Sequence, residues 1–165
     1  NGVSKSYAMT GWRIGYIVAS VDIVKQMGKL QGQSTSNPAS ISQAASIAAL
    51  NESEADVKRM VGEFQKRRNA LLDLLLDIPG VTCYKPVGSF YTFPNFSAFY
   101  EKSFEGTTVG GSITLAKFLL EEGKVALVPG IAFGADNNLR MAFAASMDVI
   151  RQGVERIAEA LVRLQ

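Results

Sequence analysis

The chain of 165 residues contains no histidine and only one cysteine, Cys83. Without histidine, neither a Ser-His-Asp triad nor a Cys-His pair can form within the chain, and the usual histidine-containing zinc sites are excluded too. We therefore expect no metal site. A single cysteine cannot form an intrachain disulfide, which is compatible with a reducing cytoplasm. We interpret Cys83 as a small buried filler residue near the start of a strand.

A strong charge imbalance and a long apolar run are also missing from the sequence. Lys and Arg number 17 against 15 Asp and Glu, and the net charge of +2 provides no basic face for nucleic acid. No apolar run is long enough to span a membrane, and no signal segment opens the chain. We predict a cytoplasmic protein without nucleic-acid or membrane partners. Because the chain lacks an initiator Met, we expect it to be a C-terminal piece of a longer protein.

The first part of the chain carries patterns of one strand and two helices. Residues 14–20 are apolar and rich in β-formers, which predicts a short buried strand, and residues 21–31 carry apolar side chains at helical spacing. Asn37 and Pro38 follow, and they predict a helix start with Asn as N-cap and Pro in the first turn.

The longest predicted helix has Ser53 as its N-cap and keeps one apolar face up to Pro79-Gly80. A helix of this length often connects two domains. We therefore place a domain boundary near its start, with residues 1–50 in one domain and residues 51–165 in another.

The remainder of the chain predicts a small sheet covered by helices. Ser112 and Ser146 are predicted caps of two helices, and Pro129-Gly130 is a predicted turn. Residues 94–111 have little pattern and are rich in Gly, Ser and Thr, which predicts a mobile surface loop. Strands are expected at residues 82–84, 89–93, 125–128 and 138–144.

Two cations near the N-terminus stand in an informative setting. Lys5 lies in a turn of small residues, and Arg13 follows eight positions later inside an apolar run. An amine can form a Schiff base with an aldehyde cofactor, and the fork of an Arg can hold a phosphate group. A Lys in a turn is more often a solvated charge, so the interpretation depends on the residues around it.

One further Arg differs from the rest. Six of the eight Arg residues occupy polar positions of predicted helices, whereas Arg140 lies in the apolar string Leu139-Arg140-Met141-Ala142-Phe143. A charge there is costly unless an anion meets it. The anion could belong to a bound molecule or to the side chain of an Asp or Glu in a structural salt bridge, and the residues alone leave both alternatives open.

The string Ser-Lys-x-Tyr-x-Met-Thr-Gly-x-Arg-x-Gly, residues 4–15, resembles the cofactor-lysine segment of the class I aminotransferases. These are fold-type I enzymes that use pyridoxal 5'-phosphate and include the aspartate aminotransferases. Residues 86–91 resemble a small-domain strand of the same family whose Phe lies close to the active site, and residues 128–134 resemble the loop that leads into the strand of Arg140.

The resemblance implies an α/β fold in which a small α+β domain follows a large cofactor-binding domain. Residues 1–50 would then be the end of the large domain, and residues 51–165 the small one. Lys5 would bind pyridoxal 5'-phosphate and act as the catalytic residue, Arg13 would hold its phosphate, and Arg140 would bind the α-carboxylate of the substrate. The family also implies a homodimer, with the Ser36-Asn37-Pro38 loop near the partner's site.

Two positions depart from the family pattern. Many relatives have a phosphate-binding Ser three residues before the lysine, where this chain has Gly2. Relatives of the animal aspartate enzyme read the second carboxylate of the substrate with an Arg at the position of Gly32. If the substrate is aspartate or glutamate, another group must hold its distal carboxylate.

We therefore expect transamination between an amino acid, aspartate first, and a 2-oxo acid such as 2-oxoglutarate. Aromatic, alanine-type or methionine-type substrates are the close alternatives. A different possibility is a non-catalytic interaction domain that keeps the motif without the activity, although the presence of Lys5, Arg13 and Arg140 argues against it.

Overall fold

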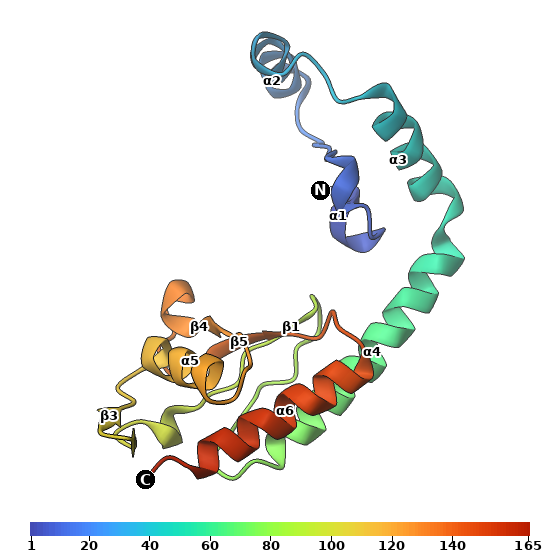
Figure 1. Cartoon of the computed structure of the whole chain (residues 1–165). Coiled ribbons are helices and arrows are strands. Elements are labelled where there is room, and N and C mark those ends of the chain that lie inside the picture. Colours follow the sequence, from blue (N-terminus) through green and yellow to red (C-terminus); the bar gives the residue numbers. More distant parts are fainter. The chain divides into compact units, whose positions relative to one another are not determined.

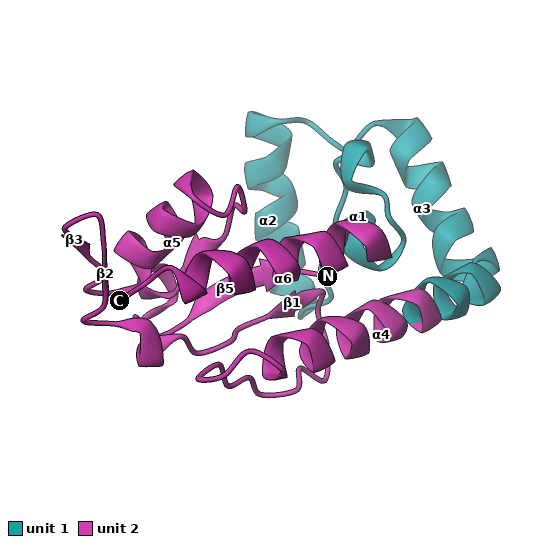
Figure 2. Cartoon of the chain, turned by 60° about the horizontal axis from the view of Figure 1, so that its bottom comes forward, with its two compact units in different colours: residues 1–61 teal, residues 62–165 magenta.

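The computed structural model describes all of residues 1–165 as a succession of helices and short strands (Figure 1). The chain divides into two compact units, Asn1–Val61 and Gly62–Gln165 (Figure 2). This division falls inside the longest helix, α4 (Glu54–Leu76). The domain boundary that we predict at residue 50 concerns the function of each part and stays a prediction.

Unit 1 (Asn1–Val61) is built from helices and loops and contains no extended strand. Besides the first part of α4, it contains the helices α1 (Val3–Ser6), α2 (Val21–Ser34) and α3 (Ser40–Glu52) and the 3-10 turn η1 (Thr10–Trp12). The predicted helix at residues 21–31 is confirmed as α2, which extends three residues further.

The strand predicted at residues 14–20 is wrong. The segment makes one isolated antiparallel bridge, between Gly2 and Gly15, and the side chains of Tyr16, Ile17 and Val18 are exposed. An extended segment becomes a strand only when a neighbouring segment bonds to its backbone N–H and C=O groups, and no other segment of unit 1 does so beside residues 17–19.

Of the two helix caps predicted in unit 1, the one at Asn37 is wrong. Helix α3 begins at Ser40 after Ala39, and the Asn37 side chain instead donates to the Pro38 carbonyl. Ser53 directly precedes α4 as predicted, and its carbonyl accepts a hydrogen bond from Val57 N, although its hydroxyl donates back to the Ala49 carbonyl in α3. Both side chains bond to nearby carbonyls, a local alternative that competes with capping.

Unit 2 (Gly62–Gln165) contains an antiparallel sheet with the strand order β1-β5-β4. Residue Tyr91 pairs with Ala142, and Val128 pairs with Arg140. The strands are β1 (Tyr91–Thr92), β4 (Val128–Pro129) and β5 (Leu139–Ala142), and the helices are the rest of α4, α5 (Ser112–Glu121) and α6 (Met147–Val162). The α/β class expected from the sequence is confirmed.

The two faces of this sheet differ in polarity. Successive side chains of a strand point to opposite faces, and in β5 the side chains of Leu139 and Met141 are buried while those of Arg140 and Ala142 are more exposed. The buried side chains join one core with the apolar faces of α4, α5 and α6. Arg140 therefore lies on the face of the sheet that is turned away from the core.

The prediction of a mobile loop at residues 94–111 is wrong. Phe96, Phe99 and Val109 in this segment are buried in the core. The segment contains the 3-10 turn η2 (Ser97–Phe99) and a hairpin of β2 (Ser103–Phe104) and β3 (Thr107–Thr108). Burial of three apolar side chains fixes a segment whose irregular spacing hides them from a periodic pattern.

The other strands of unit 2 are shorter than expected. The prediction at residues 138–144 is confirmed as β5, and the one at residues 89–93 contains β1. Residues 82–84 contribute only a bridge from Thr82 to Asn95, and residues 125–128 only the start of β4.

The predicted turns and caps of unit 2 are partly confirmed. Ser146 caps α6, because its Oγ accepts a hydrogen bond from Val149 N at 3.4 Å. The N-cap of α5 is Gly111 and not Ser112. The expected turn after Pro129 is the 3-10 turn η3 (Gly130–Phe133), which ends at Gly134 in a left-handed conformation.

Cys83 is only half-buried, so its interpretation as a buried filler is wrong. Its thiol donates to the Tyr84 carbonyl at 3.4 Å, and partial burial raises the pKa of the thiol although a backbone hydrogen bond from Phe93 lowers it.

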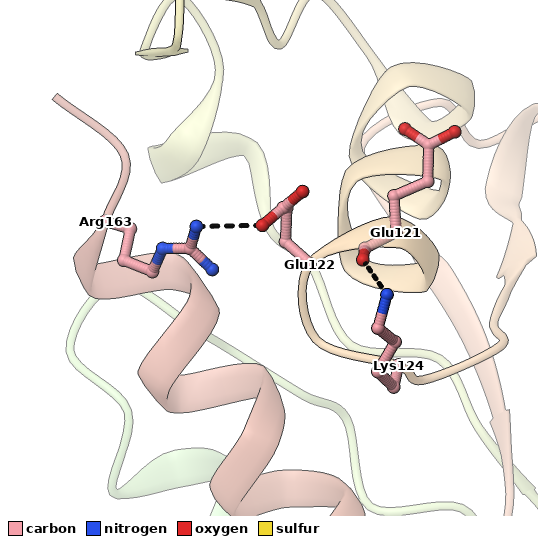
Figure 3. A network of polar contacts seen from close by, with 4 residues as sticks. All are labelled: Glu121, Glu122, Lys124 and Arg163. Carbon is pink, nitrogen blue, oxygen red and sulfur yellow. Dashed lines mark hydrogen bonds and ion pairs between the residues drawn. The ribbon is translucent and has the colours of Figure 1, made fainter.

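The C-terminal residues of the chain are held against unit 2. Arg163 Nη2 donates to Glu122 Oε2 at 2.8 Å, and Lys124 Nζ donates to the Glu121 carbonyl at 2.6 Å (Figure 3). Gln165 and Ser103 exchange two backbone hydrogen bonds. No helix of the chain has both the length and the apolar character that crossing a membrane requires.

Candidate functional site

Lys5 lies on a single helical turn that is anchored by its neighbour. In α1, the Val3 side chain is only 1% exposed, whereas the Lys5 side chain is exposed. The turn closes with hydrogen bonds from Ala8 N to the Lys5 carbonyl and from Met9 N to the Ser4 carbonyl. The buried Val3, two positions before the exposed Lys5, anchors the backbone of the turn that carries the amine.

Backbone pairing joins the Lys5 turn to the segment that follows Arg13. Asn1 and Tyr16 exchange two hydrogen bonds of 2.8 Å, and Gly2 and Gly15 form the bridge beside them. A Cβ atom on Gly15 would approach the Asn1 carbonyl oxygen to 3.1 Å, which is closer than ordinary contacts. The small residue at this position therefore permits the approach of the two segments.

Arg13 ends the 3-10 turn η1 in a left-handed conformation, with φ 52° and ψ 49°. Its Nη1 donates to the Thr10 carbonyl at 3.1 Å, and the side chain is exposed. Helix α3 supports the turn, since the buried Ser42 hydroxyl donates to the Trp12 carbonyl at 2.8 Å. No ion pair of the chain involves Arg13, so no carboxylate occupies its guanidinium.

Arg140 is held by aromatic rings and not by an acid. Its Cζ lies over the Tyr91 ring at 4.4 Å from the centroid and over the Phe133 ring at 4.7 Å. We call these two rings the aromatic clamp. None of the five ion pairs of the chain includes Arg140. No Asp or Glu side chain therefore forms a salt bridge with Arg140, so the alternative of a structural salt bridge has no support in the structure.

The loop that carries Phe133 is tied to the start of α5 by one fully buried hydroxyl. Ser112 Oγ donates to Asp136 Oδ1 at 2.6 Å and accepts from Ile131 N at 3.2 Å, and Ser112 N donates to the same carboxylate oxygen at 3.0 Å. We call this arrangement the Ser112–Asp136 latch. The two hydrogen bonds from Ser112, the hydroxyl first, lower the pKa of the Asp136 carboxyl.

A glycine is required at the start of this loop. A Cβ on Gly130 would come within 2.2 Å of the carbonyl oxygens of both Ala135 and Asn138. Gly130 N also donates to the Asn138 carbonyl at 2.8 Å, which closes the loop directly before β5. The backbone path from Gly130 to Arg140 is therefore closely constrained.

The predicted site residues divide between the two units. Lys5 and Arg13 belong to unit 1, where backbone pairing links their segments, and Arg140 belongs to unit 2. The sequence reasoning missed the roles of Tyr91, Phe133 and Asp136. Tyr91 and Phe133 lie within the two strings that resemble the family. The available signal was Arg140 itself, because an Arg in an apolar strand without an acid nearby in the sequence needs other partners, such as aromatic rings.

The two departures from the family pattern lie in uncrowded surroundings. A Cβ on Gly2 would have its nearest neighbours at 3.5 Å, and one on Gly32 would have none within 4 Å. Gly2 opens α1 without a side-chain cap. The packing of this chain would therefore accept a larger side chain at either position. What the two glycines lack is the Ser hydroxyl or the Arg guanidinium that the relatives carry there.

Comparisons with known proteins agree with these observations. The family model for aminotransferase class I and II matches residues 1–161. The aspartate aminotransferase of Geobacillus stearothermophilus is 49% identical over 160 residues, which cover 95% of this chain and 39% of that protein. The probable aspartate/prephenate aminotransferase of Rickettsia prowazekii is 45% identical over 161 residues, covering 97% and 40%.

Solved structures give the same result for the fold. The aspartate aminotransferase of Rhizobium meliloti superposes with a TM-score of 0.97 at 42% identity, covering all of this chain and 42% of that one. An aromatic aminotransferase of Pyrococcus horikoshii has a TM-score of 0.87 at 32% identity, covering 98% and 42%. The chain spans about 40% of the length of the curated relatives that it matches.

Proposed function

The chain belongs to the class I and II aminotransferase family, and we propose that it acts as part of a complete enzyme that transfers an amino group between an amino acid and a 2-oxo acid. Aspartate and 2-oxoglutarate are the proposed substrates. The observation that carries the proposal is that the family match spans residues 1–161 and includes Lys5, Arg13 and Arg140 together. The curated relatives named above carry the words aspartate aminotransferase or aspartate/prephenate aminotransferase.

Membership of this family implies dependence on pyridoxal 5'-phosphate, and the donor groups of unit 1 fit that cofactor. Lys5 offers a primary amine on an anchored turn, and Arg13 offers a guanidinium without a carboxylate partner. An amine suits an aldehyde, and a guanidinium fork suits a phosphate. When bound, the cofactor supplies the aldehyde that captures amines and a ring that accepts electrons.

The proposed work of Lys5 is covalent binding followed by proton transfer. With the cofactor bound, Lys5 Nζ would hold it at its aldehyde carbon until an amino substrate takes that place. The amine of Lys5 would then act as the base that takes the proton from the substrate α-carbon and as the acid that gives it back. In the second half of the reaction Lys5 moves the proton in the opposite direction.

The two Arg residues are proposed to orient the reacting groups. Arg13 holds the phosphate, and Arg140 binds the α-carboxylate of the substrate through two parallel hydrogen bonds. Orientation of this kind provides a large part of the rate enhancement in reactions between bound groups. The acid that pairs with the ring nitrogen, and the group that reads a distal carboxylate in place of Gly32, are proposed to lie outside this chain.

Two features of the proposal concern the whole protein. We propose a homodimer in the cytoplasm, supported by the family resemblance of the Ser36-Asn37-Pro38 loop and by the single Cys83, which has no disulfide partner in the chain.

Aromatic substrates are the second candidate, because an aromatic aminotransferase is among the similar structures.

A substrate panel with the complete enzyme tests the proposal. Aspartate with 2-oxoglutarate should give the highest kcat/KM, ahead of aromatic, alanine-type and methionine-type amino acids. Replacing Arg140 by Lys should lower kcat/KM for the amino acid and the oxo acid alike, while the cofactor stays bound. The activation free energy that corresponds to kcat/KM should rise by about 2–5 kcal/mol. Arg163→Lys is a matched control, because Arg163 also stacks on a ring but lies beside Glu122.

Each outcome of this panel has a distinct meaning. A preference for aromatic substrates would replace aspartate and keep the reaction class. Normal kcat/KM in Arg140→Lys would make Arg140 a structural residue. A purified holoprotein without turnover of any amino acid would favour the non-catalytic interaction domain.

A further inference from the structure

Phe133 is an exposed aromatic residue whose position calls for an explanation. Half of its surface is accessible, although it lies in the short 3-10 turn of the loop that leads to the strand of Arg140. A side chain of this size contributes most to stability when it is buried. Its main contact with a charged group is the Arg140 guanidinium, at 4.7 Å from the ring centroid.

We propose that Phe133 is a positioning residue for the substrate carboxylate, acting through Arg140. The proposal rests on the function proposed above, in which Arg140 binds that carboxylate. Phe133 holds the guanidinium in one orientation together with Tyr91, so that the edge carrying the N–H donors is presented before a substrate arrives.

The geometry of the aromatic clamp leaves the donors of Arg140 accessible. The five N–H groups of a guanidinium lie in its plane and point outward from its edge. Because Cζ of Arg140 lies over both rings, the clamp attracts the cation without using any of these donors. A carboxylate partner would occupy them, and the chain places none there.

Phe133 is itself held from two directions. The Phe93 ring meets it edge to face, with centroids 5.9 Å apart and an angle of 89° between the ring planes. The Ser112–Asp136 latch fixes the loop on both sides of Phe133, since Ile131 and Asp136 bond to the same buried hydroxyl. The ring cannot leave Arg140 by movement of the loop unless hydrogen bonds at a fully buried Ser break.

Tyr91 and Phe133 contribute to the clamp in different ways. Tyr91 lies on β1, which pairs directly with β5, so the sheet ladder fixes it beside Arg140. Phe133 reaches Arg140 from a loop, and its placement depends on η3 and the latch. Replacing Phe133 therefore removes one face of the clamp without disturbing the pairing of the strands.

The test is made in the complete enzyme with Phe133→Leu, which keeps an apolar side chain and removes the ring. KM should rise about 2- to 30-fold for the amino acid and the 2-oxo acid alike, with kcat nearly unchanged, because the carboxylate contact is the same in ground state and transition state. Phe133→Tyr keeps a ring and should restore KM.

Phe104→Leu is the matched control. The Arg163 guanidinium lies over the Phe104 ring at 4.4 Å, so this change removes an equivalent stack in the same unit, away from the clamp. It should leave both KM values unchanged.

A second readout does not depend on turnover. In NMR spectra of the Arg side-chain Nε–H groups, the Arg140 signal should show a ring-current shift. Phe133→Leu should reduce this shift, and Phe104→Leu should leave it unchanged. Binding of succinate, a dicarboxylate that cannot react, should weaken in Phe133→Leu by the same factor as KM rises.

Unchanged KM together with an unchanged Arg140 signal in Phe133→Leu would overturn the inference, as would failure of Phe133→Tyr to restore KM. These results differ from failure of the proposed function. In that case Arg140→Lys would leave KM and kcat as they are, while the Arg140 signal would still report whether Phe133 holds the guanidinium.

Discussion

The two units of the chain have very different interiors. Unit 2 buries one continuous core in which Leu75, Leu115 and Ile157 are completely inaccessible. Unit 1 buries a single large apolar side chain, Val3, along with the polar Ser42 and Ser46. A helical pattern therefore produces a helix in both units but a core in only one.

Helix α2 illustrates the difference. Its apolar residues Ile23, Met27 and Leu30 follow helical spacing, as those of α6 do, yet they are 53%, 43% and 73% exposed. Apolar surface of this extent on a folded chain marks an interaction surface or a tendency to associate. Unit 1 carries the proposed cofactor residues Lys5 and Arg13, so the part that holds them has the weaker interior.

The largest expected effect concerns the chain in isolation. The purified 165-residue chain should not convert aspartate and 2-oxoglutarate, because the proposed acid at the ring nitrogen lies outside it and catalysis requires the groups to be held together. A coupled assay against the complete enzyme measures this. Turnover near the rate of the complete enzyme would refute the prediction.

The exposed face of unit 1 should also make the isolated chain associate. Light scattering would show this, and Ile23→Lys together with Leu30→Lys in α2 should reduce it, whereas two Lys substitutions at exposed polar positions such as Gln65 and Asn69 in α4 should not. A chain that stays monomeric at high concentration would show that the face of α2 is not adhesive.

The next effect compares the same side chain in the two units. Ile157→Ala in α6 should lower the free energy of unfolding by about 2–5 kcal/mol, because the side chain is fully buried and leaves a cavity. Ile23→Ala in α2 should change it by less than about 0.5 kcal/mol. Amide exchange during urea unfolding, followed in α6 for the first variant and in α2 for the second, reports the two losses. Equal losses would mean that unit 1 has an interior that the exposures do not reveal.

A smaller effect depends on pH through Asp136. The hydrogen bonds from Ser112 lower the pKa of this carboxyl in the folded chain. The carboxylate thus stabilises unit 2 fully above the ordinary Asp pKa of about 3.9, and this stabilisation disappears as the pH falls through the lower, folded value. The Tyr100 hydroxyl donates to the Asp136 backbone carbonyl, and the pKa of Tyr100 is raised by burial and then by the charge of Asp136.

Urea unfolding of the chain and of Asp136→Asn between pH 3 and pH 7 checks this account. The difference in stability should be constant near neutral pH and shrink in acid. Asp73→Asn in α4 is the control, since the Asp73 side chain is exposed and makes no ion pair. A difference that grows as the pH falls would reverse the predicted sign.

The smallest effect is expected at the ion pair between Glu122 and Arg163 (Figure 3). Both side chains are partly exposed, at 33% and 44%, so water and salt weaken the attraction. Glu122→Gln should reduce the free energy of unfolding by about 0.2–1 kcal/mol, and less in high salt. A loss above about 2 kcal/mol would show that the C-terminal contacts act as a cooperative unit.

Local signals explain which parts of the fold were predictable from the sequence. Ser146 was identified as a cap because its hydroxyl and the N–H that donates to it are three residues apart, and β5 because its apolar run is continuous. The segment of Phe96 and Phe99 was misjudged, since its burial comes from distant partners such as Asn137, whose carbonyl accepts from Phe96 N. The strand at residues 14–20 failed because a strand also needs a partner outside its own sequence.

The same distinction applies to the candidate site. Lys5 and Arg13 lie within one contiguous string, and the apolar residues that single out Arg140 are its immediate neighbours in the sequence. Each of these two signals can therefore be recognised in a short stretch of sequence. The clamp joins Tyr91 to Arg140 across 49 positions, and the latch joins Ser112 to Asp136 across 24. Contacts at such separation depend on the packing of α5, η3 and the sheet, which no local pattern in one sequence reveals.

The central claim is that Lys5 carries the cofactor in the complete enzyme. Reduction of the holoenzyme with borohydride makes the bond between cofactor and amine permanent, and mass analysis of the peptides then locates it. We expect a pyridoxyl adduct on Lys5 and none on Lys25 or Lys29, which lie on the exposed helix α2 of the same unit. An adduct on either of those residues instead, or no adduct on this chain, would contradict the account.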